Sequence, residues 1–586
     1  MVKGICFTYS ELFDRQPTMD ELTELVKSVP LRHAAFALSY ISLTLRYAMQ
    51  ERGRPNFGKV QEALVAGYID DETLAILKLR FPQEKCDERP VFIPHCVLTV
   101  LRLVVSHCDP EPLPKSEDDE IVRYAIGRAC LMMNNLLFTD VEDAALRTGS
   151  EDERRTELMV QMMASFELTN PQRSDHLIPR LQLMYRVLLK DPRVKSKIAL
   201  ECEGFDFEGD FQSLVGISLD HWLLIVFAIY AYFLEGANIL DPKPDYMLIN
   251  PAVFCGTSNI TREALDIVLG TMAVPMEDLK STILNEKSTD PRYDFVSFRS
   301  RPIVTVEEGK LLPVDLAFIV EKCHTGVQWT LHDLLPRKRR QALFKAWGLL
   351  FEEYVHWLLE GMNTTPSIRY IRSPKWKGSL DESFDGILAK GAVLMPAEFK
   401  GGFLGRNARY SGDVKVFLKE LNKKFSVGCD QLADKIGALF AVDDNERKEL
   451  EDITFDDIRS VVPLLILQDH IFRVPFLNWY LNKHFQTRMA RYAIRPGVVV
   501  RPLTVVTIHD LESIIHSAEG GNFDFVYALH NRTIRDQEVG SDLIGALSTY
   551  PDFGGKHSPR IKLALDEVAQ QFSHFLFPNQ APPPTS

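Results

Sequence analysis

The sequence predicts an α/β fold in the C-terminal half of the chain, a mixed central sheet flanked by helices, preceded by a largely α-helical N-terminal region. Apolar residues recur at helical spacing through about residue 200, and short apolar strand segments alternate with helical ones after about residue 336. A chain of 586 residues is too long for one ordinary core. We therefore expect a helical domain over 1–200, a mixed α/β connecting region over 201–335, a second α/β domain over 336–576 and a disordered tail over 577–586.

The first 200 residues carry helical signals and no cluster of catalytic side chains. Thr18 and Glu21 have the spacing of a capping box, in which each side chain accepts from the other residue's backbone N–H. We expect this region to dock a protein partner, to guide nucleic acid or to act as a scaffold. Its amphipathic stretches are Leu31–Met49, Val60–Phe81, Ile93–His107, Glu120–Leu137, Glu157–Phe166 and Leu177–Leu189.

The connecting region begins helical and then changes to strand periodicity. Its most apolar run, Trp222–Leu234, has 13 residues. That is shorter than the roughly 20 residues that cross a bilayer, so we expect a buried core helix. Further helices are expected over Glu263–Thr271 and Met276–Leu284. Val304–Val306 and Leu311–Val314 flank a turn at residues 307–309 and predict a hairpin.

The stretch from Ser383 to Gly402 carries the chemistry. Asp385 lies on one short apolar run, and Glu398 and Lys400 end the next, with a tight turn at residues 389–391 between them. Strand alternation puts Glu398 and Lys400 on one face, and the turn brings Asp385 to the same end of the sheet. Carboxylates bind a hard divalent cation, and a lysine stabilises an attacking hydroxide. This combination is typical of a metal-dependent phosphodiesterase.

The order of these residues resembles the PD-(D/E)xK nuclease superfamily, which has the restriction-endonuclease-like fold. The resemblance covers about residues 336–520. It implies a helix, a three-stranded meander, a second helix and further strands. It also implies Mg²⁺, or alternatively Mn²⁺, bound by Asp385, Glu398 and the carbonyl of Phe399, with Lys400 beside the nucleophile and a 5′-phosphate product.

The resemblance also implies that the two flanking helices contribute to the site. The helix over residues 341–361 offers Glu352 or Glu353 as a further catalytic and metal-binding acid. Glu352 is favoured over Glu353 because Gly348 lies one turn earlier on the same face of the helix and, without a side chain, leaves room beside Glu352. The helix over residues 429–440 offers Gln431. The chain departs from the family pattern at Phe384, where proline is usual, and at Lys435, where one branch has tyrosine.

Beyond Gln431 the chain continues to alternate strands and helices. Residues 461–467 predict a buried strand, residues 475–485 a helix and residues 498–508 another strand. Thr507 and Asp510 have capping-box spacing at the start of the next helix. This alternation indicates a mixed sheet with helices on both faces.

Positive charge is concentrated around the predicted site. Residues 336–430 contain 17 Lys and Arg against 10 Asp and Glu, a net charge of +7 in a chain of net charge −13. This distribution favours a polyanionic substrate at this part of the chain. Trp376 is a candidate for stacking on a base, although burial is the simpler role. The cations expected to contact phosphates are Arg337, Lys338, Arg339, Arg340, Lys375, Lys377, Arg406 and Arg409.

We therefore expect a metal-dependent deoxyribonuclease, with RNA left open as a substrate. A bacterial defence or restriction effector is a setting suggested by analogy alone. The alternative is a catalytically inactive nuclease-fold protein that acts as a DNA-binding or protein-interaction scaffold. Endonuclease or exonuclease action, sequence preference and oligomeric state are not determined by any pattern in the chain.

The remaining features predict a cytoplasmic protein without a membrane segment. Nine scattered cysteines include no C-x-x-C pair, which is typical of reduced core thiols rather than of disulfides or a zinc site. The first 16 residues contain no uninterrupted apolar segment of the kind found in a secretory signal.

Overall fold

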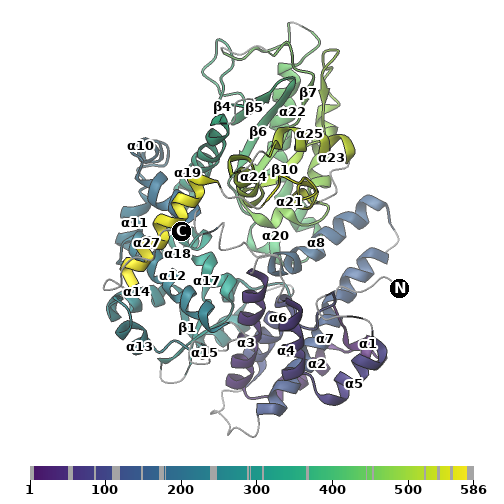
Figure 1. Ribbon diagram of the computed structural model, residues 1–586, viewed down its shortest axis with the longest axis vertical. Helices are drawn as coiled ribbons and strands as arrows, with labels where there is room; N and C mark the ends of the chain where they lie inside the picture. Colours follow the sequence, from purple (N-terminus) through teal and green to yellow (C-terminus); the bar gives the residue numbers. More distant parts are fainter. Residues whose placement is uncertain are drawn as a thin grey trace.

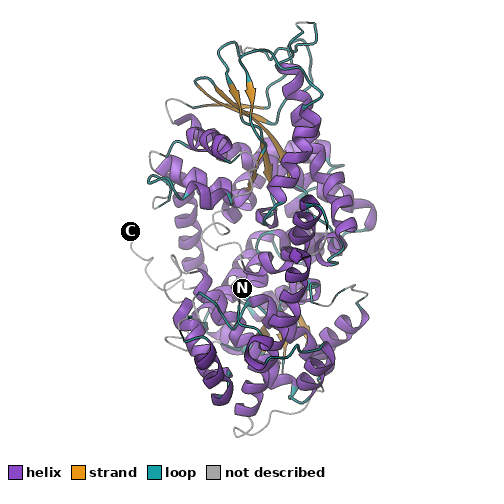
Figure 2. Ribbon diagram, turned by 90° about the vertical axis from the view of Figure 1, so that its right-hand side faces the viewer, coloured by secondary structure: helices purple, strands orange, loops and turns teal. Residues whose placement is uncertain are grey.

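The described part of the chain is mostly helical, with one large and one small β-sheet (Figures 1 and 2). The computed structural model describes residues 6–50, 57–82, 84, 88–108, 119–146, 149–169, 177, 180–237, 247–286, 290, 292–306, 309–364, 368–443, 445–451, 455–520, 523–536, 542–554 and 558–576. The expected tail over 577–586 lies outside these residues.

The N-terminal region is helical, as expected. The Thr18–Glu21 capping box is present, with Glu21 N donating to Thr18 Oγ1 over 3.2 Å. The single helix predicted over 60–81 is instead two helices, because Asp70 caps the second by accepting from Thr73 N over 2.8 Å. The helices are α1 (Tyr9–Phe13), α2 (Met19–Lys27), α3 (Leu31–Gln50), α4 (Phe57–Tyr68), α5 (Asp71–Arg80), α6 (Pro94–His107), α7 (Asp119–Leu146) and α8 (Glu151–Thr169).

The connecting region is largely helical around a three-stranded sheet. The π-helical η2 (Gln182–Val187) and the 3₁₀ helix η3 (Leu188–Lys190) stand where one regular helix was predicted. The α-helices are α10 (Pro192–Glu201), α11 (Phe207–Val215), α12 (Leu219–Gly236), α13 (Pro251–Gly256), α14 (Arg262–Met272), α15 (Met276–Asn285), α16 (Val296–Ser300), α17 (Leu316–Lys322) and α18 (Thr325–Leu334).

The small sheet contains the predicted hairpin and one strand that the sequence pattern did not reveal. β2 (Ile303–Thr305) pairs antiparallel with β3 (Leu311–Pro313), which confirms the hairpin, although residues 307 and 308 of its turn lie outside the described residues. The unexpected strand, β1 (Ala273–Pro275), pairs parallel with β2. β1 has only three residues, too few for a period of two to be visible in the sequence.

Helix α12 is the core helix that its apolar sequence predicts. Among the described residues it is the one helix long and apolar enough to cross a membrane by length and composition, and 56% of it is buried within the protein. Trp222, Ile225 and Phe233 are fully buried, and α12 contacts α17 and the C-terminal helix α27 (Pro559–Leu576). It therefore packs as an interior helix of this region.

The large sheet is mixed. Its strands run in the order β10-β8-β6-β5-β4: β4, β5 and β6 are antiparallel neighbours, and β6, β8 and β10 are parallel. The predicted strand over 461–467 is split into β7 and β8, because Pro463 has no N–H to donate within a strand. The strands are β4 (Arg369–Arg372), β5 (Gly386–Lys390), β6 (Val393–Lys400), β7 (Ser460–Val461), β8 (Leu464–Leu467), β9 (Val499–Val500) and β10 (Thr504–Thr507).

Helices cover both faces of the large sheet, as its apolar strands require. Met395, Ala397 and Phe399 belong to the core formed with α19 (Arg340–Glu360) and α24 (Ile508–Gly520). Leu394 and Leu465 belong to the core on the other face, formed with α22 (Val427–Leu439) and α23 (Leu477–Met489). Strand alternation thus directs Glu398 and Lys400 toward α22 and the intervening Phe399 toward α19.

Short elements complete the C-terminal half. The predicted capping box at Thr507 and Asp510 is present, with Asp510 N donating to Thr507 Oγ1 over 3.3 Å. In Figure 1, α27 lies beside α12 and away from the large sheet. The remaining elements are η6 (Arg337–Arg339), η7 (Gly361–Thr364), α20 (Arg406–Tyr410), α21 (Val414–Leu421), η8 (Asn422–Ser426), η9 (His470–Arg473), α25 (Phe525–Arg535) and α26 (Leu543–Leu547).

A buried ion pair links the N-terminal helices to the connecting region. Arg46 on α3 donates from Nε to Asp315 over 2.9 Å, and both side chains are almost completely buried. Asp315 also accepts from Ser42 Oγ over 2.7 Å and from Ala317 N at the start of α17 over 2.7 Å. Its carboxylate therefore connects α3 to α17.

Replacing Asp315 by Ala should lower the free energy of unfolding by about 3–5 kcal/mol, because the Arg46 charge would be left buried and unpaired. Chemical denaturation followed by circular dichroism measures this loss. The control is Glu24→Ala, which removes an exposed ion pair to Lys27 and should cost less than about 0.5 kcal/mol. Equal effects of the two substitutions would show that the buried pair does not connect the regions.

Candidate active site

The β5–β6 hairpin brings Asp385 against the end of β6. Gly386 pairs with Ala397, so Asp385, one residue before β5, lies beside Glu398 and Phe399. Phe399 N donates to Asp385 Oδ2 over 2.6 Å. The hairpin turns at Gly391, whose φ of 53° lies in the left-handed region that glycine adopts readily.

Glu398 and Lys400 meet two side chains from α22. Lys400 Nζ donates to Glu398 Oε1 over 2.8 Å and to Gln431 Oε1 over 2.7 Å. Lys435 Nζ donates to Glu398 Oε2 over 2.8 Å. Glu398 is only 3% exposed, and both of its oxygens are bonded to ammonium groups. The structure therefore brings together four residues predicted from sequence and adds Lys435.

Close packing of α22 on the sheet makes these contacts possible. Gly428, in the first turn of α22, lies directly over Lys400 and Leu465. A Cβ at Gly428 would approach the Leu465 side chain to 2.8 Å and Lys400 Cε to 3.0 Å. The glycine thus allows the helix to lie close enough for Gln431 to reach Lys400.

The surroundings of Asp385 raise its pKa to about 7. Burial is the largest cause, because it disfavours the charged carboxylate, and the neighbouring charge of Glu398 adds to it. The hydrogen bond from Phe399 N and the charges of Lys435 and Lys400 act in the opposite direction. Burial and the nearby charge of Glu398 therefore outweigh the backbone hydrogen bond and the two lysines, so Asp385 holds its proton more tightly than an exposed aspartate does.

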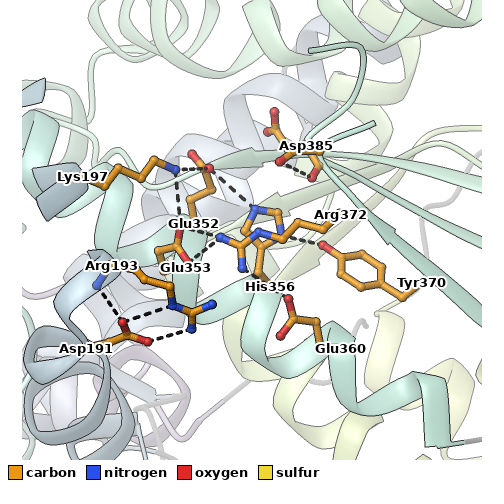
Figure 3. A network of polar contacts seen from close by, with 11 residues as sticks. Asp191, Arg193, Lys197, Glu352, Glu353, His356, Glu360, Tyr370, Arg372 and Asp385 are labelled. Carbon is orange, nitrogen blue, oxygen red and sulfur yellow. Dashed lines mark hydrogen bonds and ion pairs between the residues drawn. The ribbon is translucent and has the colours of Figure 1, made fainter. Parts of the chain in front are cut away.

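Glu352 and Glu353 on α19 belong to a second network of charges (Figure 3). Lys197 Nζ on α10 lies 3.1 Å from Glu352 Oε1 and 3.3 Å from Glu353 Oε1. Burial opposes ionisation of Glu352, but His356 and Lys197 outweigh it and hold its pKa below the ordinary value. His356 in turn contacts the Tyr370 hydroxyl through Nδ1 over 2.6 Å.

The two glutamates have different surroundings. Glu353 is 9% exposed and pairs with Arg372 over 2.5 Å. Glu352, in contrast, lines a cavity of about 710 Å³ together with Phe399 and Lys400. The cavity gives Glu352 access to the candidate site, whereas the Glu353 carboxylate is held by Arg372 and Lys197.

The oxygen-only donors of this site fit a hard cation of the Mg²⁺ type. Asp385 and Glu398 lie together, and burial together with the charge of Glu398 raises the pKa of Asp385. Glu352 comes from α19, on the opposite face of the sheet from α22. Within the part of the chain that the structure describes, no three His, Cys, Asp or Glu side chains form a group that could hold a metal ion. Glu352 thus stays apart from the other two acids.

The cations predicted to contact phosphates differ in their availability. Arg337, Lys338 and Lys375 are exposed. Arg339 pairs with Asp210 over 2.6 Å, and the exposed Lys377 pairs with Glu449 over 2.7 Å. Arg340 Nε donates to the Leu335 carbonyl over 3.3 Å.

Arg406 and Arg409, in the loop expected to close over substrate, are held by internal carboxylates. Arg406 pairs with Asp294 over 2.8 Å and with Glu286 over 2.8 Å. Arg409 pairs with Asp469 over 2.9 Å and also with Glu167, and its side chain is largely buried. Arg409 is thus part of an interior ion network, and its guanidinium is not presented to a phosphate.

The sequence analysis did not assign three residues that the structure places in these networks. Lys435 lies one helical turn after Gln431, a spacing that puts both on one face, and this signal could have identified it. His356 lies one turn after Glu352, so the same argument applies. Lys197 comes from a distant helix, and no spacing links it to Glu352. Trp376, the candidate for base stacking, is half-buried and packs near Phe384 with ring centroids 6.3 Å apart.

Comparison with known proteins adds no relative. No protein-family model, no curated protein and no solved structure matches this chain.

Asp385→Asn should stabilise the metal-free protein at about pH 8 and leave it unchanged at about pH 4. The folded-state pKa of about 7 lies above the ordinary 3.8, so ionisation costs folding free energy as the pH rises between these values. We expect a gain of about 1–3 kcal/mol at the higher pH, since asparagine can still accept from Phe399 N. Thermal unfolding in EDTA measures it. The exposed Asp381→Asn is the control, and a loss of stability at the higher pH in Asp385→Asn would contradict the assignment.

Proposed function

We propose that this chain is a metal-dependent deoxyribonuclease of the PD-(D/E)xK type that hydrolyses phosphodiester bonds at the end of the large sheet. The observation that carries the proposal is the contact of Lys400 with both Glu398 and Gln431, beside Asp385. The order of strands supports it: an antiparallel β4-β5-β6 meander continues into the parallel β8, with α19 and α22 on opposite faces. A helix, a three-stranded meander, a second helix and further strands are what the resemblance to this superfamily implies.

Lys400 is the residue that we assign to the nucleophile. Phosphodiester hydrolysis develops negative charge on the attacking oxygen, and a fixed ammonium group stabilises that charge in the transition state. Lys400 is suited to this role because Glu398 and Gln431 hold its Nζ in one position while it lines the open cavity. Gln431 positions Lys400 through Oε1 and has its amide NH₂ group to offer to a water or to the scissile strand.

Asp385, Glu398 and the carbonyl of Phe399 would hold Mg²⁺. When bound, the ion would polarise a phosphoryl oxygen and add positive charge beside Asp385, whose pKa is raised by burial and by Glu398. Mg²⁺ in proteins commonly takes one or two carboxylates and keeps several waters, so two acids are sufficient. Glu352, on α19, would assist metal binding directly or through a water, across the cavity that it lines together with Lys400.

Lys435 and Lys197 balance the charge of the acids. Lys435 bonds Glu398, and Lys197 bonds Glu352, so each of these two carboxylates has a lysine partner. Lysines are suited to such a role because an ammonium group on a flexible stem can move when another cation arrives.

Lys400→Ala should reduce Mg²⁺-dependent cleavage of DNA by about 10²–10³-fold, because the transition state would lose its fixed positive charge. Cleavage of supercoiled, linear and single-stranded DNA by the full-length protein measures the effect. Lys27→Ala, which removes an exposed lysine of the N-terminal region, is the matched control and should cleave like the wild type. Cleavage by folded Lys400→Ala at the wild-type rate would reject the assigned role.

Mg²⁺ should raise the free energy of unfolding of the wild type by about 2.7 kcal/mol at a hundred times its Kd. Asp385→Asn and Glu398→Gln should abolish this stabilisation, because each removes a ligand, whereas Asp381→Asn should retain it. Thermal unfolding and titration calorimetry measure binding without reference to cleavage. A wild-type protein whose stability is unaffected by saturating Mg²⁺ would contradict the proposed metal site.

A further inference from the structure

The cavity beside Lys400 has an aromatic wall that the proposed cleavage chemistry does not use. It has a volume of about 710 Å³. Glu352, Phe399 and Lys400 line it on the side of the candidate site, and Trp329 and Phe344 line it on the side of α18 and α19. Cavities of this size bind ligands of several ring systems. The candidate site thus opens into a space with flat apolar surfaces.

The aromatic rings of this cavity are exposed. Trp329 is 37% exposed and Phe344 is 42% exposed, and their ring centroids lie 6.1 Å apart at 71°. Phe403, after β6, also lines the cavity, with its centroid 6.5 Å from that of Trp329. Single exposed apolar side chains are ordinary, but a cluster of rings in a cavity beside polar groups indicates a binding surface.

The charges of the cavity suit an anionic ligand. Lys345, Lys400 and Lys424 line it, against Glu352 as the one acidic residue among its lining side chains. Lys345 contacts Glu201 and Lys424 contacts Glu420, but the two lysine side chains remain 55% and 41% exposed. Exposed pairs of this kind are weak, so these lysines can exchange their partners for phosphates.

We infer that the cavity binds a single-stranded stretch of polynucleotide, whose bases stack on Trp329 and Phe344 while its phosphates meet Lys345 and Lys424. This inference rests on the proposed nuclease function and specifies its substrate. Bases stack on aromatic side chains whatever their sequence, and lysines follow the phosphates. In a duplex the base faces are covered by their neighbours, so only an unpaired or splayed strand can use these rings.

A second cavity adjoins the first and extends the surface that we propose for the strand. It has a volume of about 400 Å³ and shares Trp329 and Leu404 with the first. His332 and Arg406 contribute polar groups to its wall. Trp329 therefore lies where the two cavities adjoin, and a strand that leaves Lys400 can continue past its ring.

The test uses the full-length protein in EDTA and fluorescence anisotropy with a labelled oligothymidylate, an oligouridylate and a DNA duplex of the same length. Trp329→Leu and Phe344→Leu should each weaken binding of the single strand by about 5- to 100-fold and leave duplex binding unchanged. Trp329→Phe should retain most of the affinity, because a ring remains. The oligouridylate distinguishes RNA from DNA as the source of the strand.

Tyr527→Leu is the matched control, because Tyr527 is an aromatic residue on α25 that is 57% exposed. The N-cap residue of α25, Asp524, pairs with Lys390, which lies at the opposite end of β5 from Asp385. It should bind single strands like the wild type. If Trp329→Leu does not fold, the inference is tested with Phe344→Leu and Lys345→Ala. For Lys345→Ala, the affinity for the single strand should depend less on salt concentration. Equal losses on single strand and duplex, or no loss, would overturn the inference. So would an altered oligomeric state of Trp329→Leu with unaltered binding, which would assign the cavity to a second copy of the chain.

Two outcomes separate this inference from the proposed function. If the wild-type protein binds oligothymidylate through these rings but cleaves no nucleic acid with Mg²⁺, the proposed nuclease activity is refuted and the strand-binding cavity is supported. If the wild-type protein cleaves DNA and the Trp329→Leu and Phe344→Leu variants bind single strands normally, the nuclease activity is supported and the strand-binding cavity is overturned.

Discussion

The buried carboxylate of Glu398, bonded by Lys400 on one oxygen and by Lys435 on the other, constrains how α22 packs on the large sheet. Glu398 is only 3% exposed, and a buried charge is costly unless it is paired. Helix α22 must therefore lie close enough to the sheet for Lys435 to reach Glu398. Gly428 allows that approach. The same approach brings Gln431 to Lys400. Thus the packing of one helix on one strand both satisfies a buried charge and assembles the candidate active site.

The sheet divides the acidic residues of the site between its two faces. Asp385 and Glu398 belong with α22, whereas Glu352 comes from α19 and is balanced by Lys197 and His356. Glu398 and Glu352 are therefore paired with lysines in two separate networks. A cation at Asp385 and Glu398 would relieve the repulsion that raises the pKa of Asp385, and this links metal binding to stability.

Much of the positive charge around the site has internal partners. Arg339, Arg406 and Arg409 join distant segments through Asp210, Asp294 and Asp469, so their charges contribute to the fold. Arg337, Lys338 and Lys375 remain exposed, and exposed lysines also lie beside the aromatic rings of the cavity. A binding surface built from rings and lysines differs from one built from arginines alone, because it offers base stacking as well as attraction for phosphate.

The pattern of apolar and charged residues along the chain was enough to predict most elements and the spacing of the central residues. Apolar periodicity located most helices and the β5–β6 hairpin, and alternation along β6 put Glu398 and Lys400 on one face. These signals are local, since they depend on neighbours within a turn or a strand. The tertiary structure alone decided which charges are paired. Lys197 meets Glu352 across 155 residues, and Arg409 meets Glu167 across 242. Such contacts depend on how the helices pack, and that information is not carried by the spacing of residues along the chain.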